Sequence, residues 1–352
     1  MHIHEKYMLR CLQLAELGSG NVAPNPMVGA VLVFKDRIIG EGFHRQYGRE
    51  HAEVNCLASV KEENRYLIPE STMYVSLEPC AHYGKTPPCA DLLIANNIPK
   101  VVIGIIDTFD KVSGKGVTRL KNAGVEVITG VLEEACYAIN RRFFIFHRHQ
   151  RPFIILKWAQ SANNCIAGAG KLPMQISNGF SARRVHRWRS EESAIMVGTN
   201  TALIDDPSLT TRYWKGNNPV RILLDMQLKV PDSSAIFSAD NWKPGDLPRT
   251  IIFNEKKEDT KDHLLYIRLV NNDHLIPQLN KHLYTLGIQS LLVEGGTLLI
   301  QSFLDAGIWD EARIITNQSL VIENGYPAPS LNGGKLKTSE TYVTDFHTCY
   351  SS

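Results

Sequence analysis

The stretch His51-Ala52-Glu53, followed by Pro79-Cys80 and by Pro88-Cys89, decides how the first half of the chain folds. One imidazole and two thiolates are a ligand set that suits Zn²⁺, and three protein ligands leave the fourth tetrahedral position to a water. Glu53 lies two residues beyond the histidine, and a carboxylate beside such a water can take its proton and later deliver it to a leaving group. The pattern therefore predicts a catalytic zinc site and not a structural one.

The same pattern is close to the signature of zinc deaminases, which is His-x-Glu followed by Pro-Cys-x-x-Cys. In this chain residues 81–88 separate the two cysteines and form an insertion that must loop out before Cys89 returns to the metal. A strand over 72–77 leads into Cys80, and helices begin near His51 and after Pro88. Taken alone, a histidine or a buried cysteine is more often a packing residue. Only the joint pattern favours the metal.

Length and composition limit the remaining possibilities. A chain of 352 residues suggests two domains. With 43% hydrophobic and 21% charged residues and a net charge of +2, nothing favours a nucleic acid or an anionic membrane as partner. We expect a cytoplasmic protein, because no leading signal segment or membrane-spanning run is evident. The seven scattered cysteines do not resemble a disulfide framework. A homo-oligomer remains possible.

The first half alternates strands and helices, which predicts an α/β domain. A helix is expected over 5–17, and a hairpin over 30–34 and 38–44 should make Asn25 and His44 neighbours near the start of the His51 helix. Further elements are expected at 100–106 (strand), 116–122 (helix), 125–128 (strand) and 133–146 (closing helix). Residues 147–152 are expected to be a polar linker, with domains at 1–148 and 149–352. Gly114-Lys115-Gly116 is either a phosphate loop or a surface turn.

The second half begins another α/β pattern with a strand over 153–159. A helix opened by Ser177-Asn178 carries several arginines, which form either a solvated basic face or a phosphate site. Strands are expected over 194–198 and 220–224, with a short helix starting at 199, and variable loops over 232–261 around a strand at 250–253. The strand over 290–294 runs into Gly295-Gly296 and a helix over 298–304. That turn is either a tight turn or a phosphate-binding helix N-terminus.

Four stretches together resemble the bifunctional deaminase/reductase family of riboflavin biosynthesis: 78–89, 25–29, 201–207 and 293–296. The resemblance spans nearly the whole chain, and its most specific part is 78–89. It implies a cytidine deaminase-like three-layer N-terminal domain and a dihydrofolate reductase-like C-terminal domain. It also implies hydrolytic deamination of 2,5-diamino-6-ribosylamino-4(3H)-pyrimidinone 5′-phosphate, a small-molecule substrate, followed by NADPH-dependent reduction of the ribosyl chain to ribityl.

The resemblance assigns roles to residues of both halves. His51, Cys80 and Cys89 would hold Zn²⁺ and Glu53 would move the proton, while Asn25, His44 and Lys85 would contact the first substrate. NADPH would lie near Ala159, Gln175, Thr201, Asp205, Gly296, Thr297 and Leu298. The second substrate would lie near Lys157, Arg189, Leu209, Arg212 and Glu294. The preference for NADPH over NADH comes from the resemblance alone.

The chain departs from the family pattern at Ala162-Asn163-Asn164-Cys165, where a Leu-Asp-Gly-Arg-like run is usual, and at Gln175, where tryptophan is common. One alternative is therefore an active deaminase with a decayed reductase. A second is another nucleobase or nucleoside deaminase, although its generic cysteine spacing is not seen here. A third is a binding module with a structural zinc ion, which predicts a fourth protein ligand such as His82 or His44.

Overall fold

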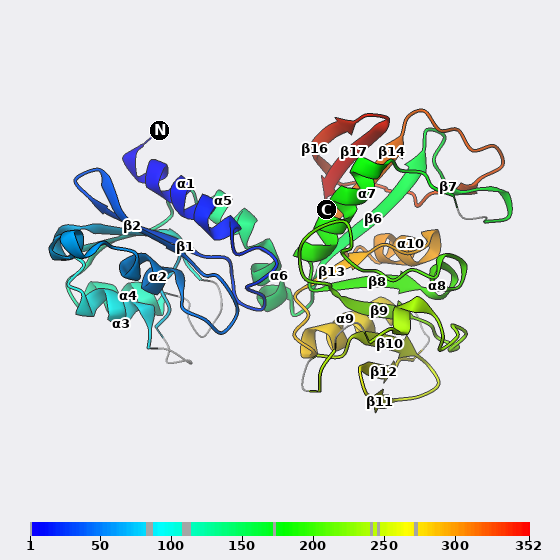
Figure 1. Cartoon of the computed structure of the whole chain (residues 1–352), viewed down its shortest axis with the longest axis horizontal. Coiled ribbons are helices and arrows are strands. Elements are labelled where there is room, and N and C mark those ends of the chain that lie inside the picture. The colour runs from blue at the N-terminus through cyan, green and yellow to red at the C-terminus, as the bar shows by residue number, and fades with distance from the viewer. Residues whose placement is uncertain are drawn as a thin grey trace. The chain divides into compact units, whose positions relative to one another are not determined.

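The computed structural model describes residues 2–81, 87–107, 114–171, 174–239, 242–244, 247–270 and 274–352 (Figure 1). The chain divides into two compact units, Met1–Gln150 and Arg151–Ser352, called here the N-terminal and C-terminal units. Among the helices in these described ranges, none is long and apolar enough to cross a membrane.

A mixed sheet forms the centre of the N-terminal unit, and over the described residues its strand order is β2-β1-β3-β4-β5. The strands are β1 (Gly29–Phe34), β2 (Arg37–Phe43), β3 (Thr72–Leu77), β4 (Lys100–Ile105) and β5 (Glu126–Ile128). β1 runs antiparallel to β2 and β3, whereas β3, β4 and β5 are parallel. The parallel strands therefore end at the same edge of the sheet, where the segment containing Cys80 begins.

Helices cover both faces of this sheet (Figure 1). One face carries α2 (Ala52–Ala58), α3 (Cys89–Ala95) and α4 (Lys115–Asn122), and the other carries α1 (Ile3–Glu16), α5 (Glu133–Ile139) and α6 (Arg141–His149). A 3-10 helix, η1 (Glu62–Glu70), precedes β3. Ala30 and Leu32 of β1 pack toward the first face and Val31 and Val33 toward the second, because successive strand side chains alternate. The three-layer arrangement is confirmed.

The expected closing helix over 133–146 and linker over 147–152 were wrong in two respects. The helix is divided at Asn140, whose side chain makes two hydrogen bonds of 2.8 Å with the backbone of Met27. α6 then continues to His149, because the ring of His147 packs on Phe143 with a centroid separation of 4.5 Å. The first half of the expected linker, residues 147–149, is therefore the last turn of a helix.

The C-terminal unit is built on a larger sheet, whose described strands follow the order β11-β12-β10-β9-β8-β13-β6-β14-β17-β16. The strands are β6 (Phe153–Ser161), β8 (Ala194–Gly198), β9 (Val220–Leu224), β10 (Thr250–Asn254), β11 (Asp259–Lys261), β12 (Leu264–Arg268), β13 (Ser290–Val293), β14 (Glu311–Asn317), β16 (Lys335–Tyr342) and β17 (Asp345–Ser351). From β12 to β14 neighbouring strands are parallel, and β11, β17 and β16 are antiparallel additions. β7 (Cys165–Ala167) and β15 (Tyr326–Pro327) pair separately.

The parallel strands read as nearly continuous apolar runs because both of their faces are covered. Ile154, Ile155 and Leu156 of β6 are all fully buried. The helices are α7 (Gly179–Glu191), α8 (Thr199–Asp205), α9 (Leu275–Thr285) and α10 (Thr297–Asp305), with short 3-10 turns η2 (Ala169–Lys171) and η3 (Ala235–Phe237).

The strand order also shows where this unit can bind a ligand. The chain moves outward from β8 to β9 and β10, returns as β13 between β8 and β6, and continues as β14 beyond β6. In open parallel sheets, ligands bind outside the carboxyl ends of strands where the connections diverge. The ends of β6, β8 and β13 therefore mark the expected site.

Candidate active sites

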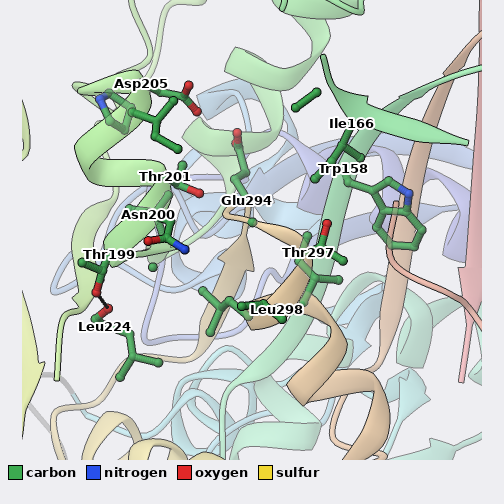
Figure 2. A pocket seen from close by; sticks show the side chains of 18 of the residues that line it. Trp158, Ile166, Thr199, Asn200, Thr201, Asp205, Leu224, Glu294, Thr297 and Leu298 are labelled. Atoms are coloured by element: carbon green, nitrogen blue, oxygen red, sulfur yellow. Dashed lines mark hydrogen bonds between the residues drawn. The ribbon is translucent and has the colours of Figure 1, made fainter. Parts of the chain in front are cut away.

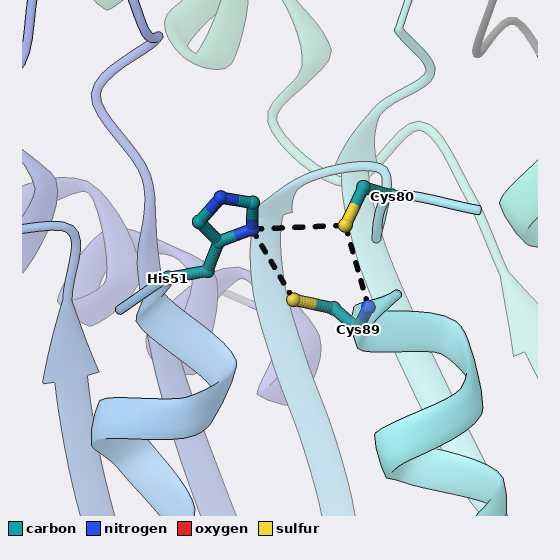
Figure 3. A group of neighbouring side chains, drawn as sticks. All are labelled: His51, Cys80 and Cys89. Carbon is teal, nitrogen blue, oxygen red and sulfur yellow. Dashed lines mark hydrogen bonds between the residues drawn. The ribbon is translucent and has the colours of Figure 1, made fainter. Parts of the chain in front are cut away.

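Three side chains that could hold a metal ion converge at one edge of the sheet in the N-terminal unit (Figure 3). His51 is the N-cap of α2, Cys80 follows β3, and Cys89 is the first residue of α3. The end of one strand and the starts of two helices thus bring together residues that are far apart in the sequence, as the sequence pattern predicted.

The distances between these side chains fit a zinc ion. His51 Nδ1 lies 3.6 Å from Cys80 Sγ and 3.4 Å from Cys89 Sγ. Tetrahedral zinc with Zn–S of ~2.3 Å and Zn–N of ~2.0 Å separates nitrogen and sulfur ligands by about 3.5 Å. The donor set and its spacing therefore match the metal that the sequence predicted.

Of the two thiols in this cluster, Cys80 is the one whose pKa is lowered, which favours its thiolate form. A hydrogen bond from the Cys89 side chain lowers the pKa of Cys80, and His51 lowers it further. The backbone N–H of Cys89, at the start of α3, also donates to Cys80 Sγ over 3.3 Å. Helix N-termini stabilise thiolates through their partial positive charge, so the start of α3 supports the charged form of the ligand.

Glu53 lies in the first turn of α2 and is only 3% exposed. Burial raises its pKa to about 7, and the negative charge of Cys80 adds to this rise. A carboxyl group with a pKa near the working pH can both accept and return a proton. Its environment therefore suits the proton transfer that the sequence assigned to it.

Asn25 and His44 are neighbours, as the hairpin predicted. Asn25 Nδ2 lies 3.0 Å from His44 Nε2, and His44 Nδ1 lies 3.0 Å from the Glu50 carbonyl oxygen. Because a carbonyl only accepts, Nδ1 carries the proton, and Nε2 of the neutral ring accepts from Asn25. The His44 ring meets the His51 ring edge-on, with centroids 5.5 Å apart. The pair therefore lies beside the cluster of His51, Cys80 and Cys89.

Across the described ranges, the cluster of possible metal ligands has three members and no fourth. His44, one candidate for a fourth ligand, has both ring nitrogens engaged as above. His82, the other candidate, and Lys85, the predicted phosphate ligand, lie outside the described residues. Where the structure describes the chain, a coordination position stays available to water.

The Gly114-Lys115-Gly116 segment is neither of the two features that the sequence left open. The backbone N–H groups of Gly114 and Gly116 donate to the carboxylate of Glu78 over 3.0 and 2.8 Å. Glu78 is buried. An internal carboxylate thus occupies the start of α4, where a phosphate would otherwise bind.

The C-terminal unit contains a cavity of about 750 Å³ at the carboxyl ends of its parallel strands (Figure 2). Its wall includes Lys157 and Ala159 of β6, Gly198 at the end of β8, and Glu294 directly after β13. This is the place that the strand order indicated. The volume is within the range of sites for small ligands and cofactors.

A buried group of three charges forms part of the cavity wall. Arg189 donates to both oxygens of Glu294 over 2.9 Å, and Lys157 Nζ lies 3.6 Å from Glu294. Burial alone would raise the pKa of Glu294, but the charges of Arg189 and Lys157 outweigh it and hold the pKa at about 2. Burial lowers the pKa of Lys157, and Glu294 opposes that change. Two basic side chains therefore flank one carboxylate in the cavity wall.

Two glycines allow the turns after β8 and β13 to approach closely. A Cβ atom on Gly295 would lie 2.7 Å from Val197 Cα and 2.9 Å from the Gly198 nitrogen. Gly296 is the N-cap of α10 and has φ of +40°, in the left-handed region that favours glycine. The N-terminus of α10 consequently opens at the cavity, whose lining includes Gly296, Thr297 and Leu298.

The cavity brings together all but one of the predicted reductase residues: Lys157, Ala159, Gln175, Arg189, Thr201, Asp205, Leu209, Glu294, Gly296, Thr297 and Leu298. Arg212 is the exception, because its exposed side chain donates to Ser208 over 3.2 Å and does not line the cavity. Leu209 has φ of +53° although it is buried, and such backbone strain in a branched residue is concentrated at functional sites.

The arginines of α7 do not act as one group. Arg189 is buried against Glu294, whereas Arg187 pairs with Glu191 at 2.8 Å on the same helix and Arg184 pairs with Glu340. Arg183 lies over the ring of Trp214. Neither a uniform solvated face nor one shared phosphate site describes them.

The two departures from the family pattern do not disturb the cavity. Asn163 Oδ1 accepts from the Ser161 hydroxyl at 2.7 Å and from the Ile322 backbone N–H at 3.0 Å, so the unusual turn is held in place. Asn164 has φ of +58°, which asparagine tolerates better than most residues. Gln175 is exposed and lines the cavity.

Sequence reasoning missed Thr199 and Asp225, which also line the cavity. Thr199 Oγ1 donates to Asp225 Oδ1 over 3.0 Å. It also lies 3.1 Å from the carbonyl oxygen of Leu224, and Figure 2 labels both Thr199 and Leu224. Asp225 directly follows β9. A polar residue at the carboxyl end of a parallel strand was the signal that could have identified it.

Comparisons with known proteins agree with this division into two sites. The cytidine and deoxycytidylate deaminase zinc-binding region matches residues 1–105, and the RibD C-terminal domain matches residues 152–324. The riboflavin biosynthesis protein RibD of Aquifex aeolicus is 38% identical over 312 residues, covering 88% of this chain and 85% of that protein. RibD of Escherichia coli K12 is 34% identical over 355 residues, and the match covers 95% of this chain and 89% of that protein.

Solved structures show the same likeness over both units. The diaminohydroxyphosphoribosylaminopyrimidine deaminase/5-amino-6-(5-phosphoribosylamino)uracil reductase of Thermotoga maritima has a TM-score of 0.88 at 34% identity and covers 99% of each chain. Acinetobacter baumannii RibD has a TM-score of 0.88 at 28% identity, covering 99% of this chain and 98% of that one.

Proposed function

Because this chain belongs to the RibD family of bifunctional riboflavin biosynthesis enzymes, we propose that the residues assembled above carry its two reactions in sequence. The chain is a hydrolytic deaminase and a reductase. The expected cytidine deaminase-like and dihydrofolate reductase-like domains are confirmed. The proposal concerns the roles of individual residues and the identity of the nicotinamide cofactor.

In the deaminase half, His51, Cys80 and Cys89 would hold zinc. A bound zinc ion supplies a nucleophile at neutral pH by lowering the pKa of water. Glu53 takes the proton that this water loses and returns it to the departing amino group of 2,5-diamino-6-ribosylamino-4(3H)-pyrimidinone 5′-phosphate. The observation that carries this assignment is the pair of Nδ1–Sγ distances of 3.4 and 3.6 Å.

Asn25 and His44 would orient the pyrimidine ring in this site. His44 is held neutral, because burial lowers its pKa, so the pair offers hydrogen-bonding groups without a charge. Lys85 would contact the substrate phosphate from the insertion between the cysteines, which would explain why this family needs a longer insertion than other deaminases.

In the reductase half, NADPH would lie against Ala159, Gln175, Thr201, Asp205 and the α10 start at Gly296, Thr297 and Leu298. It supplies the two electrons that convert ribosyl to ribityl. Lys157, Arg189, Leu209 and Glu294 would contact the substrate, with Arg212 at its outer end. The two basic side chains of the Lys157, Arg189 and Glu294 group suit a phosphorylated substrate.

Two alternatives lose support on particular observations. A decayed reductase is disfavoured because the cavity, its glycine turns and its buried charges are all formed. A deaminase of another substrate class is disfavoured because the likeness covers both units. Action in the cytoplasm, without nucleic acid or membrane as partner, remains a prediction, and assembly into a homo-oligomer remains possible.

The substitution Glu53→Gln tests the proton shuttle. It keeps the shape of the side chain but removes its ability to accept a proton, so ammonia release should fall by about 10²–10⁴-fold. Zinc content, measured by atomic absorption, should remain that of the wild type. Glu63→Gln, an exposed position on η1, is the matched control and should release ammonia normally. Undiminished release from a zinc-loaded Glu53→Gln variant would remove the proposed role.

A further inference from the structure

We propose that Glu78 is a positioning residue of the deaminase site, which caps helix α4 across the sheet edge and thereby fixes Cys80 for the metal. The inference rests on the proposed zinc site and adds to it a residue that touches neither metal nor substrate. It also accounts for the Gly114-Lys115-Gly116 segment.

Glu78 receives four backbone N–H groups. Its Oε2 accepts from Asp107 at 3.2 Å and from Gly114 at 3.0 Å. Its Oε1 accepts from Gly116 at 2.8 Å and from Val117 at 3.1 Å. A buried carboxylate is costly unless it is hydrogen-bonded. Four donors satisfy this one, so its position is closely defined.

The start of α4 requires such an acceptor. The first N–H groups of a helix have no partner within the helix, and an N-cap side chain usually binds those at the second and third positions. The N-cap of α4 is Gly114, which has no side chain and φ of +71°. Glu78 supplies the missing oxygen from the end of β3, and its negative charge is favourable at the positive end of the helix dipole.

The helix also contacts the chain between Glu78 and Cys80. A Cβ atom on Gly116 would lie only 2.0 Å from the carbonyl oxygen of Pro79. Glycine at this position therefore lets the α4 backbone lie against Pro79, while the neighbouring carboxylate holds the helix start. The two contacts together restrain the residue directly before Cys80.

Cys80 is then fixed from its other side by α3. The Ala90 N–H donates to the Cys80 carbonyl oxygen over 3.1 Å, and the Cys89 N–H donates to its sulfur over 3.3 Å. Upstream, the Glu78 N–H donates to Ile105 of β4 over 3.0 Å. Metal–ligand distances tolerate shifts of only about 0.2 Å, so a loosened strand end would weaken coordination.

The test uses two independent lesions of the same contact. Glu78→Gln places an amide N–H₂ among backbone N–H donors, and Gly116→Ala keeps the carboxylate but pushes Pro79 aside. Loss of an outer partner of a metal site typically costs 10–100-fold in metal affinity. We expect a loss of this size in both variants, measured by chelator competition on the full chain.

Gly124→Ala is the matched control. Gly124 follows the other end of α4 with φ of +84°, and a Cβ there would meet nothing within 4 Å. This substitution strains α4 without touching Pro79, so it should lower thermal stability and leave zinc affinity at the wild-type value. Cobalt-substituted protein gives a second readout, since the sulfur-to-cobalt charge-transfer band should shift in Glu78→Gln and Gly116→Ala only.

The inference would be overturned if Glu78→Gln and Gly116→Ala kept the zinc affinity and the cobalt spectrum of the wild type. It would also be overturned if Gly124→Ala lost as much zinc affinity as these two variants, because the loss would then reflect stability in general. A wild-type protein without a sulfur-to-cobalt band would instead contradict the zinc site itself. The two failures are therefore distinguishable.

Discussion

Glu53, Glu78 and Glu294 have three different environments, and these set what each can do. Burial raises the pKa of Glu53 to about 7, with Cys80 as a second cause. Glu294 is equally buried, but Arg189 and Lys157 outweigh burial and hold its pKa at about 2. Glu78 is surrounded by four backbone N–H groups. Glu53 can therefore exchange a proton at neutral pH, whereas Glu294 stays a fixed anion.

Glu294→Gln should destabilise the C-terminal unit in a pH-dependent manner. The folded-state pKa of about 2 lies below the ordinary value of 4.5 for a glutamate, so the ionised group stabilises the fold above about pH 4.5. This contribution, about 3 kcal/mol, is lost as pH falls from 4.5 toward 2. Removing one partner of a buried ion pair typically lowers the free energy of unfolding by about 3–5 kcal/mol. This agrees in size with the contribution derived from the pKa.

Tryptophan fluorescence during urea unfolding reports on the C-terminal unit, because all five tryptophans lie after residue 150. The difference in unfolding free energy between wild type and Glu294→Gln should be largest at pH 5–7 and should shrink steadily at lower pH. A difference that stays constant between pH 3 and pH 6 would contradict the assigned pairing.

At the scale of elements, both sites lie where strands end and helices begin. His51 and Cys89 stand at the starts of α2 and α3, and the cavity opens between the β8–α8 and β13–α10 turns. Helix starts offer unpaired N–H groups and a partial positive charge. The same local geometry therefore serves a thiolate in one unit and the wall of a ligand cavity in the other.

Gly295→Ala should impair the reductase and leave the deaminase intact. The new Cβ would meet Val197 and Gly198 at under 3 Å, so the α10 start must move away from β8. Misplacement on this scale typically costs up to about 100-fold in rate. We expect the KM for NADPH to rise by about tenfold or more in steady-state assays.

Gly307→Ala is the control for this prediction. Gly307 follows the other end of α10 with φ of +64°, and a Cβ there would meet no atom within 4 Å. It should reduce stability slightly and keep the KM of the wild type. A normal KM in Gly295→Ala would show that the turn does not shape the cofactor site.

Local patterns predicted these elements well and their long-range partners poorly. The strand over 72–77 and the helix starts near His51 and Pro88 follow from apolar runs and proline position. Glu78 could not be found in the same way, because its partners are backbone N–H groups, which carry no side-chain signal. They belong to Asp107, Gly114, Gly116 and Val117. The packing of His147 on Phe143, four residues apart on α6, is by contrast a local signal that the linker interpretation overlooked.

At the scale of the whole molecule, the two sites lie in two different compact units. The expected order of two α/β domains is observed. The sequence of the C-terminal hairpin, β16 and β17, contains no pattern that predicts its strands. Most β16 residues are exposed, so the alternation that identifies a half-buried strand is missing. The family resemblance supplied what periodicity could not, namely the substrate and the order of reactions.

The most direct test of the account follows ammonia release and NADPH absorbance together in the full chain, given the diaminopyrimidine phosphate. The wild type should release ammonia first and then consume NADPH in equal molar amount. Glu53→Gln should do neither with this substrate, yet should oxidise NADPH normally when supplied with the deaminated pyrimidine. NADPH consumption by Glu53→Gln on the diaminopyrimidine, or ahead of ammonia in the wild type, would contradict the account.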